Sequence, residues 1–506
     1  MSQADSGLSK RNLWTYTLAS IGRDTAAGLF SGYLITYVLY TKNLTDAQFS
    51  LISMGLVFAR IFDGFNDPIM GNVIEVTRTK WGKFKPWLFI GMLGSAIIFF
   101  FSFSNSLQGW TYAILFIVMF LVYDLFFTMN DIAYWGMVPS LAKKKEDRDR
   151  LTSRTVLFAG IGGGLTGIIV PTFTAGEATI GNSAVTAYRT IAIIFIALFI
   201  GGQMITLLGV KEDPLPPKGE GTVDKVGLKT IFGTIKNNDQ LMWSLAIFLL
   251  ATVGQGLMTG GLGINYIFFE FGYNGLLFTV FSSLGAVVTG LVMLFFTPIS
   301  KRFKRDQLMK TATISIVAGA AFMLLVGLLV PASAGMFKFA LLTLANLFVF
   351  GGQSIYYLII MICIANTVEY NEWKTGARAE GIIFSVRPFI TKVGWAVISF
   401  MTLIIFLLTG VRNYTNQISD IENAAAATGM SVEAKSEGIK AVLAAVPAGK
   451  SAALLACMTI IPAVLAIASY YLYNKKYNIT EEKYEMILAD LKERRGDAPA
   501  EDAVEA

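Results

Sequence analysis

The sequence predicts an all-α membrane protein with twelve transmembrane helices in two six-helix bundles and with both termini in the cytoplasm. Composition is the first of three observations behind this prediction: 54% of the 506 residues are hydrophobic and 15% are charged, whereas soluble domains carry about 25% charged residues. The second is a series of apolar runs of about 20 residues, a length with which a helix crosses a bilayer; a membrane barrel would show short alternating segments instead. The third is an alternation of basic and non-basic loops along the chain.

The apolar runs divide the chain into twelve predicted spans. They are Leu13–Tyr40, Phe49–Val73, Pro86–Phe103, Trp110–Val138, Arg154–Phe173, Tyr188–Leu208, Leu241–Phe271, Leu276–Ile299, Leu308–Leu329, Phe337–Ile364, Ile382–Thr409 and Ser451–Tyr473. Because no cleavage site of small residues follows an early apolar core, we expect the first span to be retained.

The loops between these spans set the predicted orientation. Those after spans two, four, six, eight and ten are basic, as in residues 78–85 and 301–305, whereas the opposite loops are short and nearly free of Lys and Arg, apart from the last. Basic loops stay in the cytoplasm, so both termini are predicted there. The net charge of +6 therefore reflects membrane orientation, and binding of nucleic acid is not expected.

The predicted domain organisation follows from the loop lengths. The longest interior loop lies between spans six and seven, and this arrangement is typical of a two-bundle transporter with its site at the bundle interface. We expect short external helices without a catalytic role before the last span, and a solvated helix followed by a disordered acidic end in the tail. The predicted parts are a cytoplasmic N-terminus (1–12), an N-terminal bundle (13–209), a central cytoplasmic loop (210–240), a C-terminal bundle (241–473) with an external insert (411–450), and a cytoplasmic tail (474–506).

Cysteine and histidine usage limits the chemistry. The two cysteines, Cys363 and Cys457, fall in apolar runs and are expected to be small buried hydrophobes. They are too few for a disulfide framework or a zinc site. The chain has no histidine, which removes the commonest metal ligand and the easiest proton relay, so any coupling chemistry must use carboxylates, lysine and arginine.

Two aspartates four residues apart, Asp63 and Asp67, lie within the second predicted span. That spacing places both carboxylates on one helix face, where each charge costs about 2.5–3.5 kcal/mol at mid-membrane. A cation that binds and leaves offsets this cost. A hard cation takes oxygen ligands, and Asn66 and Thr128 are able to add them. The sequence therefore predicts a site for sodium or a proton, with both ions left open, and no further cofactor.

A second group of polar residues suggests recognition of hydroxyl groups. Trp135 follows Asp131 by one helical turn, and a carboxylate beside an aromatic ring suits a sugar. Taken alone, however, Trp135 is more readily interpreted as a packing or interface residue. Asp24 is either a second hydroxyl acceptor or the partner of a neighbouring arginine. Lys392 either pairs with a second-span aspartate or biases which carboxylate is available to the cation, and Arg387 is expected to be a structural anchor.

The stretch 59–71, together with 77–87, resembles the glycoside–pentoside–hexuronide:cation symporters of the major facilitator superfamily. The resemblance extends over nearly all twelve spans and implies the major facilitator fold. It also implies that the second-span aspartates, Asp63 and Asp67, bind the coupling cation, with Asn66 and Thr128 as helper ligands.

Further positions match this family along the chain. The resemblance implies sugar-binding roles for Arg23, Asp24, Asp131, Trp135, Arg154 and Tyr357. It implies charge-balancing or gating roles for Arg60, Arg378, Glu380 and Lys392. Three features depart from the family pattern: Arg23 replaces a lysine, Asn130 precedes the aspartate, and Tyr357 stands where a tryptophan is expected, which puts the identity of the sugar in doubt.

The function implied is cation-coupled sugar uptake by alternating access, and not an enzymatic activity. The protein is expected to work as a monomer in a bacterial inner membrane. Two alternatives stay open. One is a lysolipid carrier of the same fold. The other is an intramembrane phosphotransferase, which would need a second pair of aspartates at four-residue spacing; Asp124 and Asp131 have a different spacing.

Overall fold

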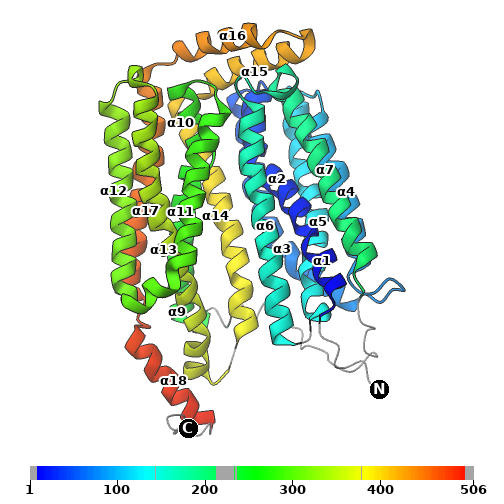
Figure 1. Ribbon diagram of the computed structural model, residues 1–506, viewed down its shortest axis with the longest axis vertical. Helices are drawn as coiled ribbons and strands as arrows, with labels where there is room; N and C mark the ends of the chain where they lie inside the picture. The colour runs from blue at the N-terminus through cyan, green and yellow to red at the C-terminus, as the bar shows by residue number, and fades with distance from the viewer. Residues whose placement is uncertain (1–7, 143, 212–232, 234–235, 378, 496–506) are drawn as a thin grey trace. The chain divides into compact units, whose positions relative to one another are not determined.

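The computed structural model describes residues 8–142, 144–211, 233, 236–377 and 379–495, and for residues 65, 68, 259, 381, 384 and 385 the backbone alone. The described part is almost entirely α-helical (Figure 1). The helices are α1 (Lys10–Thr17), α2 (Ala19–Thr41), α3 (Asp46–Val76), α4 (Lys85–Ser104), α5 (Gly109–Leu141), α6 (Lys145–Thr174), α7 (Ala184–Gly209), α9 (Asp239–Thr259), α10 (Gly261–Phe271), α11 (Gly275–Arg302), α12 (Arg305–Leu329), α13 (Met336–Thr375), α14 (Glu380–Thr409), α15 (Arg412–Thr428), α16 (Val432–Ala444), α17 (Ala448–Lys476) and α18 (Glu481–Arg495).

The protein is a multi-pass membrane protein. Within the described residues, 10 helical segments are long and apolar enough to cross a membrane, one of them made of α9 and α10 together, and the bent helix α3 raises the number to 11. Helix α2, which carries Arg23 and Asp24, is not among them. The predicted number of twelve and the predicted orientation of the termini are compatible with this count and stay predictions.

The helices group into two compact units. Unit 1 consists of residues 1–220, 260–283 and 399–454, and unit 2 consists of residues 221–259, 284–398 and 455–506. The boundary lies at the break between α9 and α10 and passes within α11, α14 and α17. Unit 1 thus contains one end of several later helices, and the predicted division into six and six spans stays a prediction.

Small residues allow close helix packing in unit 1, as is usual in membranes. Helix α2 packs against α6 and α7, and α4 packs against α5. A Cβ atom on Gly22 would lie 2.1 Å from the carbonyl oxygen of Leu198, so the α2–α7 contact depends on glycine. Helix α3 begins with a capping box between Thr45 and Gln48, which satisfies backbone N–H groups at the helix start.

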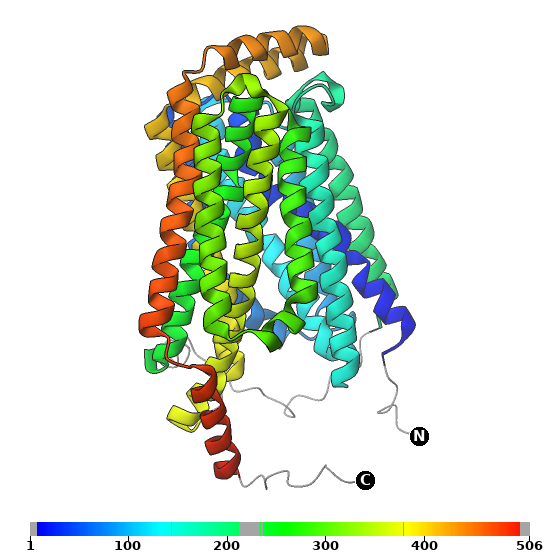
Figure 2. The same ribbon diagram turned by 60° about the vertical axis from the view of Figure 1, so that its left-hand side comes forward.

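Unit 2 is organised around α13, which packs against α9, α12 and α18. A Cβ atom on Gly352 would lie 2.6 Å from the carbonyl oxygen of Ala312, which explains the close approach of α12 and α13. Helix α18 lies beyond the end of α17 (Figure 2). One face of α18 is buried, at Ile487 and Leu491, and Trp373 donates to Asp490 at 2.9 Å. The tail helix is therefore packed on one side, where the sequence predicted a solvated helix.

Candidate cation and sugar sites

The guanidinium group of Arg23 lies at the centre of the sugar-site residues predicted in unit 1. Its Nη1 donates to Oδ1 of Asp131 at 2.8 Å, and its Nε and Nη2 donate to Oδ2 of Asp24 at 3.1 and 3.0 Å. The Arg23 side chain is 5% exposed. Charge-assisted bonds of this kind are the strong ones, so Arg23 fixes the positions of both carboxylates.

Two aromatic rings lie against the same guanidinium. Its Cζ is 4.8 Å from the ring centroid of Tyr134 and 5.3 Å from that of Trp135, within the range of cation–π attraction. Tyr134 in turn stacks on Tyr16 of α1 at 4.3 Å, and each hydroxyl donates to the backbone carbonyl of the other residue at 2.6 Å. Sequence reasoning missed this tyrosine pair, although Tyr134 follows Asp131 by three residues and so shares its helix face.

The two carboxylates differ from Arg23 in exposure. The side chains of Asp24 and Asp131 are 27% and 42% exposed. A carboxylate has about four acceptor positions, and the described hydrogen bond to Asp131 uses Oδ1 alone. The geometry therefore combines fixed carboxylates that still reach solvent with an adjacent indole ring, which is suitable for binding a polyhydroxylated molecule. The sugar-binding role itself stays a prediction.

The other two predicted sugar-site residues have different described contacts. The guanidinium of Arg154 lies 5.1 Å from the ring of Trp14. Tyr357 belongs to unit 2, where its hydroxyl accepts a hydrogen bond from Arg387 and its ring lies 5.8 Å from the Arg387 Cζ. Arg387 thus anchors Tyr357, and the sugar-binding roles of Arg154 and Tyr357 stay predictions.

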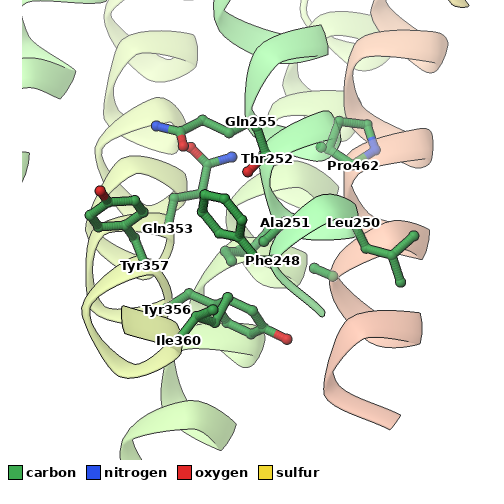
Figure 3. Close-up of a pocket in the computed structure, with 13 residues that line it drawn as sticks. Phe248, Leu250, Ala251, Thr252, Gln255, Gln353, Tyr356, Tyr357, Ile360 and Pro462 are labelled. Atoms are coloured by element: carbon green, nitrogen blue, oxygen red, sulfur yellow. The ribbon is translucent and has the colours of Figure 1, made fainter. Parts of the chain in front are cut away.

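Tyr357 is one of the residues that line a pocket within unit 2 (Figure 3). The space in it that a water-sized molecule can occupy is about 30 Å³. Thr252, Gln255 and Gln353 contribute polar groups to a lining that is otherwise largely apolar. Gln353 is 8% exposed, and its Oε1 has no hydrogen-bond partner among the described residues. Uncharged polar residues within apolar spans are a weak sequence signal, and we did not predict this pocket.

Asp63 and Thr128 meet at the predicted cation site. Oγ1 of Thr128 on α5 donates to Oδ1 of Asp63 on α3 at 2.9 Å, and Asp63 is 4% exposed. Asn66 is 6% exposed, and its Nδ2 has no hydrogen-bond partner among the described residues. Asp67 is half-buried. Carboxylate, hydroxyl and amide oxygens are ligands that suit a hard cation, and the cation-binding roles of these four residues stay predictions.

Helix α3 bends between the two aspartates. The segments Asp46–Gly64 and Ile69–Val76 meet at 42°. Proline has no N–H and disturbs the carbonyl four residues earlier, and Pro68 is four residues after Gly64. The four-residue spacing of Asp63 and Asp67 predicts one continuous helix face. The bend places Asp63 before the break and Asp67 within it, so the two carboxylates do not lie on one straight helix face.

The predicted charge-balancing residues are only partly described. The Arg60 guanidinium lies 5.2 Å from the ring of Phe120. Lys392 is half-buried on α14, and Glu380 is exposed at the first position of that helix. Arg378 lies outside the described residues. In the part of the chain that the structure describes, no group of three or more His, Cys, Asp or Glu side chains is placed to hold a metal.

Comparison with known proteins identifies the family. The model of the MFS/sugar transport protein family matches residues 15–481. The raffinose carrier protein of Pediococcus pentosaceus is 28% identical over 494 residues, covering 94% of this chain and 70% of the carrier. The lactose permease of Lactobacillus helveticus is 26% identical, over 95% of this chain and 71% of the permease. The glucuronide carrier protein homolog of Escherichia coli is 24% identical, over 77% of this chain and 82% of the carrier.

Solved structures support the same fold. The nucleoside transporter NupG has a TM-score of 0.57 at 13% identity, over 92% of this chain and all (100%) of that protein. A D-xylose–proton symporter has a TM-score of 0.54 at 14% identity, over 86% and 96%. At such low identity these structures show the fold alone. Taken together with the family match, they show that the chain has the major facilitator fold and belongs to the MFS/sugar transport family, the glycoside–pentoside–hexuronide:cation symporters.

Proposed function

We propose that the protein is a secondary active symporter that couples the entry of sodium ions or protons to the uptake of a sugar across a bacterial inner membrane. The observation that carries this proposal is the Arg23 cluster. Arg23 holds Asp24 and Asp131 in place while both carboxylates remain accessible beside Trp135. The relatives named as raffinose, lactose and glucuronide carriers support a sugar as the ligand.

The charge of this cluster favours a neutral sugar. The one guanidinium and two carboxylates in direct contact here sum to a formal charge of −1, which disfavours an acidic sugar at this cluster. Arg154, whose sugar-binding role is a separate prediction, is not part of this sum. Carboxylates accept hydrogen bonds from sugar hydroxyls, and the Trp135 ring offers an apolar surface to a sugar face. We therefore propose a neutral glycoside as the substrate class, in keeping with relatives named for raffinose and lactose.

Helix α5 connects the proposed sugar and cation sites. Thr128 bonds Asp63, and Asp131, three residues later on the same helix face, bonds Arg23. Cation binding beside Asp63 neutralises a buried charge and restrains the side chain of Thr128. This restraint also orders the next turn of α5, which contains Asp131. Each ligand then favours binding of the other, with a coupling free energy of about 1–3 kcal/mol. The loaded carrier rocks between outward-open and inward-open forms.

Binding measurements on the purified full-length protein test the substrate class. Raffinose, lactose, glucuronide and a lysolipid are added separately, with and without sodium, at several pH values, while thermal unfolding is recorded. We expect a neutral glycoside to raise the unfolding temperature, and sodium or low pH to enlarge the shift, because a ligand that binds the folded state stabilises it. A shift with the lysolipid alone would reject the sugar assignment, and a shift with glucuronide alone would reject the neutral class.

A further inference from the structure

The insert between α14 and α17 contains an ion pair that is closed off from solvent. Nζ of Lys435 on α16 lies 3.3 Å from Oε1 of Glu422 on α15, and their side chains are 1% and 0% exposed. Burial raises the pKa of the Glu422 carboxyl above its ordinary value, and the opposing effects of the Lys435 ammonium and the backbone N–H of Ala184 offset this rise only in part. A buried pair loses much hydration free energy, so it persists only where further polar contacts offset that loss.

Those further contacts lie at the start of α7. The backbone N–H of Ala184, the first residue of α7, donates to Oε2 of Glu422 at 2.6 Å. The Ser183 hydroxyl donates to the backbone carbonyl of Glu422 at 2.7 Å. A carboxylate at a helix N-terminus is stabilised by the helix dipole. Glu422 thus joins the insert to α7 through a charged contact that is fully enclosed.

Helix α15 also holds the connection between α2 and α3. Nη1 of Arg412 donates to Asp46 at 2.6 Å, and Nδ2 of Asn423 donates to the carbonyl of Thr41 at 2.9 Å. Nδ2 of Asn43 donates to Oδ1 of Asp420 at 2.8 Å. Within unit 1, α15 and α16 run across the helix ends and not along them (Figure 1). The insert is therefore bound non-covalently to α2, α3 and α7.

The same end of unit 1 contains tight contacts between early and late helices. The Tyr40 hydroxyl of α2 donates to Asn265 of α10 at 2.6 Å. The Thr172 and Thr279 hydroxyls of α6 and α11 lie 2.9 Å apart. A Cβ atom on Gly275 would lie 1.5 Å from the Pro171 carbonyl oxygen, so α6 and α11 touch through backbone. These early and late helix ends must separate if the carrier opens on this side.

We propose that the α15–α16 insert is an external latch, in which Glu422 stabilises the conformation closed to the outside. The insert is covalently continuous with the late helices α14 and α17, and its contacts with α2, α3 and α7 are non-covalent. Opening toward the outside therefore breaks the Glu422–Ala184 contact. This inference rests on the proposed alternating-access function, and it adds a device that sets how often the outside opens.

A cysteine reporter tests the latch without any sugar or coupling gradient. Thr279→Cys is placed in full-length protein that carries Cys363→Ser and Cys457→Ser, and a membrane-impermeant maleimide is added from outside. Glu422→Gln keeps the side-chain size and removes the charge, and we expect it to raise the labelling rate at least about threefold, because a charge-assisted bond is replaced by a neutral one. Glu433→Gln, which changes an exposed glutamate of α16, is the matched control and should leave the rate unchanged. Equal labelling rates for all three proteins would overturn the proposal.

A cross-link provides the second test, which holds even if Glu422→Gln does not fold. Asn43→Cys and Asp420→Cys replace side chains in direct contact. We expect oxidation to stop sugar uptake and a reductant to restore it, because the insert can no longer leave the early helices. Uptake at the unoxidised rate after complete cross-linking would overturn the latch. Failure of the proposed function appears separately, as absence of sugar uptake before oxidation.

Discussion

Two ion-paired clusters in unit 1, Arg23 with its two aspartates and Glu422 with Lys435, are built from similar groups and differ in exposure. Arg23 is buried, but its partners Asp24 and Asp131 are 27% and 42% exposed. Glu422 and Lys435 are 0% and 1% exposed. A carboxylate that reaches solvent keeps acceptor positions for a ligand, whereas an enclosed carboxylate uses its charge to hold helices together. In these two clusters, the exposure of the carboxylates separates the candidate binding site from the structural contact.

The largest expected effect is a loss of stability when the enclosed Glu422–Lys435 ion pair is broken. Glu422→Ala leaves the Lys435 ammonium buried without its partner, a change that typically costs about 3–5 kcal/mol. We expect the thermal unfolding temperature of the purified protein to fall by several degrees, while the sugar affinity of the folded fraction stays close to that of the unmodified protein. Removing the charge of exposed Glu433 serves as the control. If Glu422→Ala unfolds at the same temperature as the control, the enclosed pair does not hold helices together.

Asp131, the more exposed carboxylate beside Arg23, should show the opposite pattern: a loss of sugar affinity with little change in stability. Asp131→Asn keeps the shape but loses the charge that accepts from Arg23, and we expect sugar affinity to fall by about 100-fold, roughly 2.7 kcal/mol. The unfolding temperature should change little, since the side chain is partly solvated. Equilibrium binding and thermal unfolding are measured on the same preparation, with exposed Asp149→Asn as control. A large loss of stability with unchanged sugar affinity would show that Asp131 is a structural contact and not a ligand-binding group.

The link between the two proposed sites is expected to give a smaller change. Thr128→Val keeps the volume and removes the hydroxyl that donates to Asp63. Sugar binding should persist, but its enhancement by the coupling ion should fall by about fivefold or more, the lower end of typical coupling free energies. Sugar affinity is measured with and without the ion. Full enhancement in Thr128→Val would remove α5 as the connection.

The smallest expected effect concerns unit 2. Gln353→Leu replaces the buried amide of the pocket around Tyr357, and we expect the KM for sugar uptake to rise by about two- to fivefold if this amide bonds a sugar hydroxyl, equivalent to a net hydrogen bond of about 0.5–1 kcal/mol. Gln353→Asn is the matched polar variant and should show a smaller rise. An unchanged KM in the leucine variant would exclude the pocket from sugar binding.

The sequence allowed correct predictions for charged residues within the spans, because a buried charge requires a nearby polar or charged partner. Charged residues in spans must find partners, and Arg23, Asp24, Asp131 and Trp135 do lie together. Apolar runs likewise predicted helices at most of the expected positions, because length and hydrophobicity are local properties. The bend at Pro68 was readable in principle, since proline disrupts a helix interior.

Long-range contacts could not be predicted in this way. Glu422 bonds a residue 238 positions earlier in the chain, and Tyr16 and Tyr134 bond across 118 positions. Neither pair has a periodicity or spacing that marks it, because such contacts arise from tertiary packing. The unit 2 pocket was missed for the same reason: Gln255 and Gln353 come from different helices and appear in the sequence as isolated polar residues.

Uphill sugar uptake into proteoliposomes tests the central claim most directly. A sodium gradient at fixed pH and a proton gradient without sodium are imposed in turn, with a neutral glycoside equal on both sides at the start. We predict net accumulation under one of these gradients in the unmodified protein, and none in Asp63→Cys or Asp67→Cys, which should still equilibrate sugar across the membrane. Accumulation that survives in both variants would contradict the account.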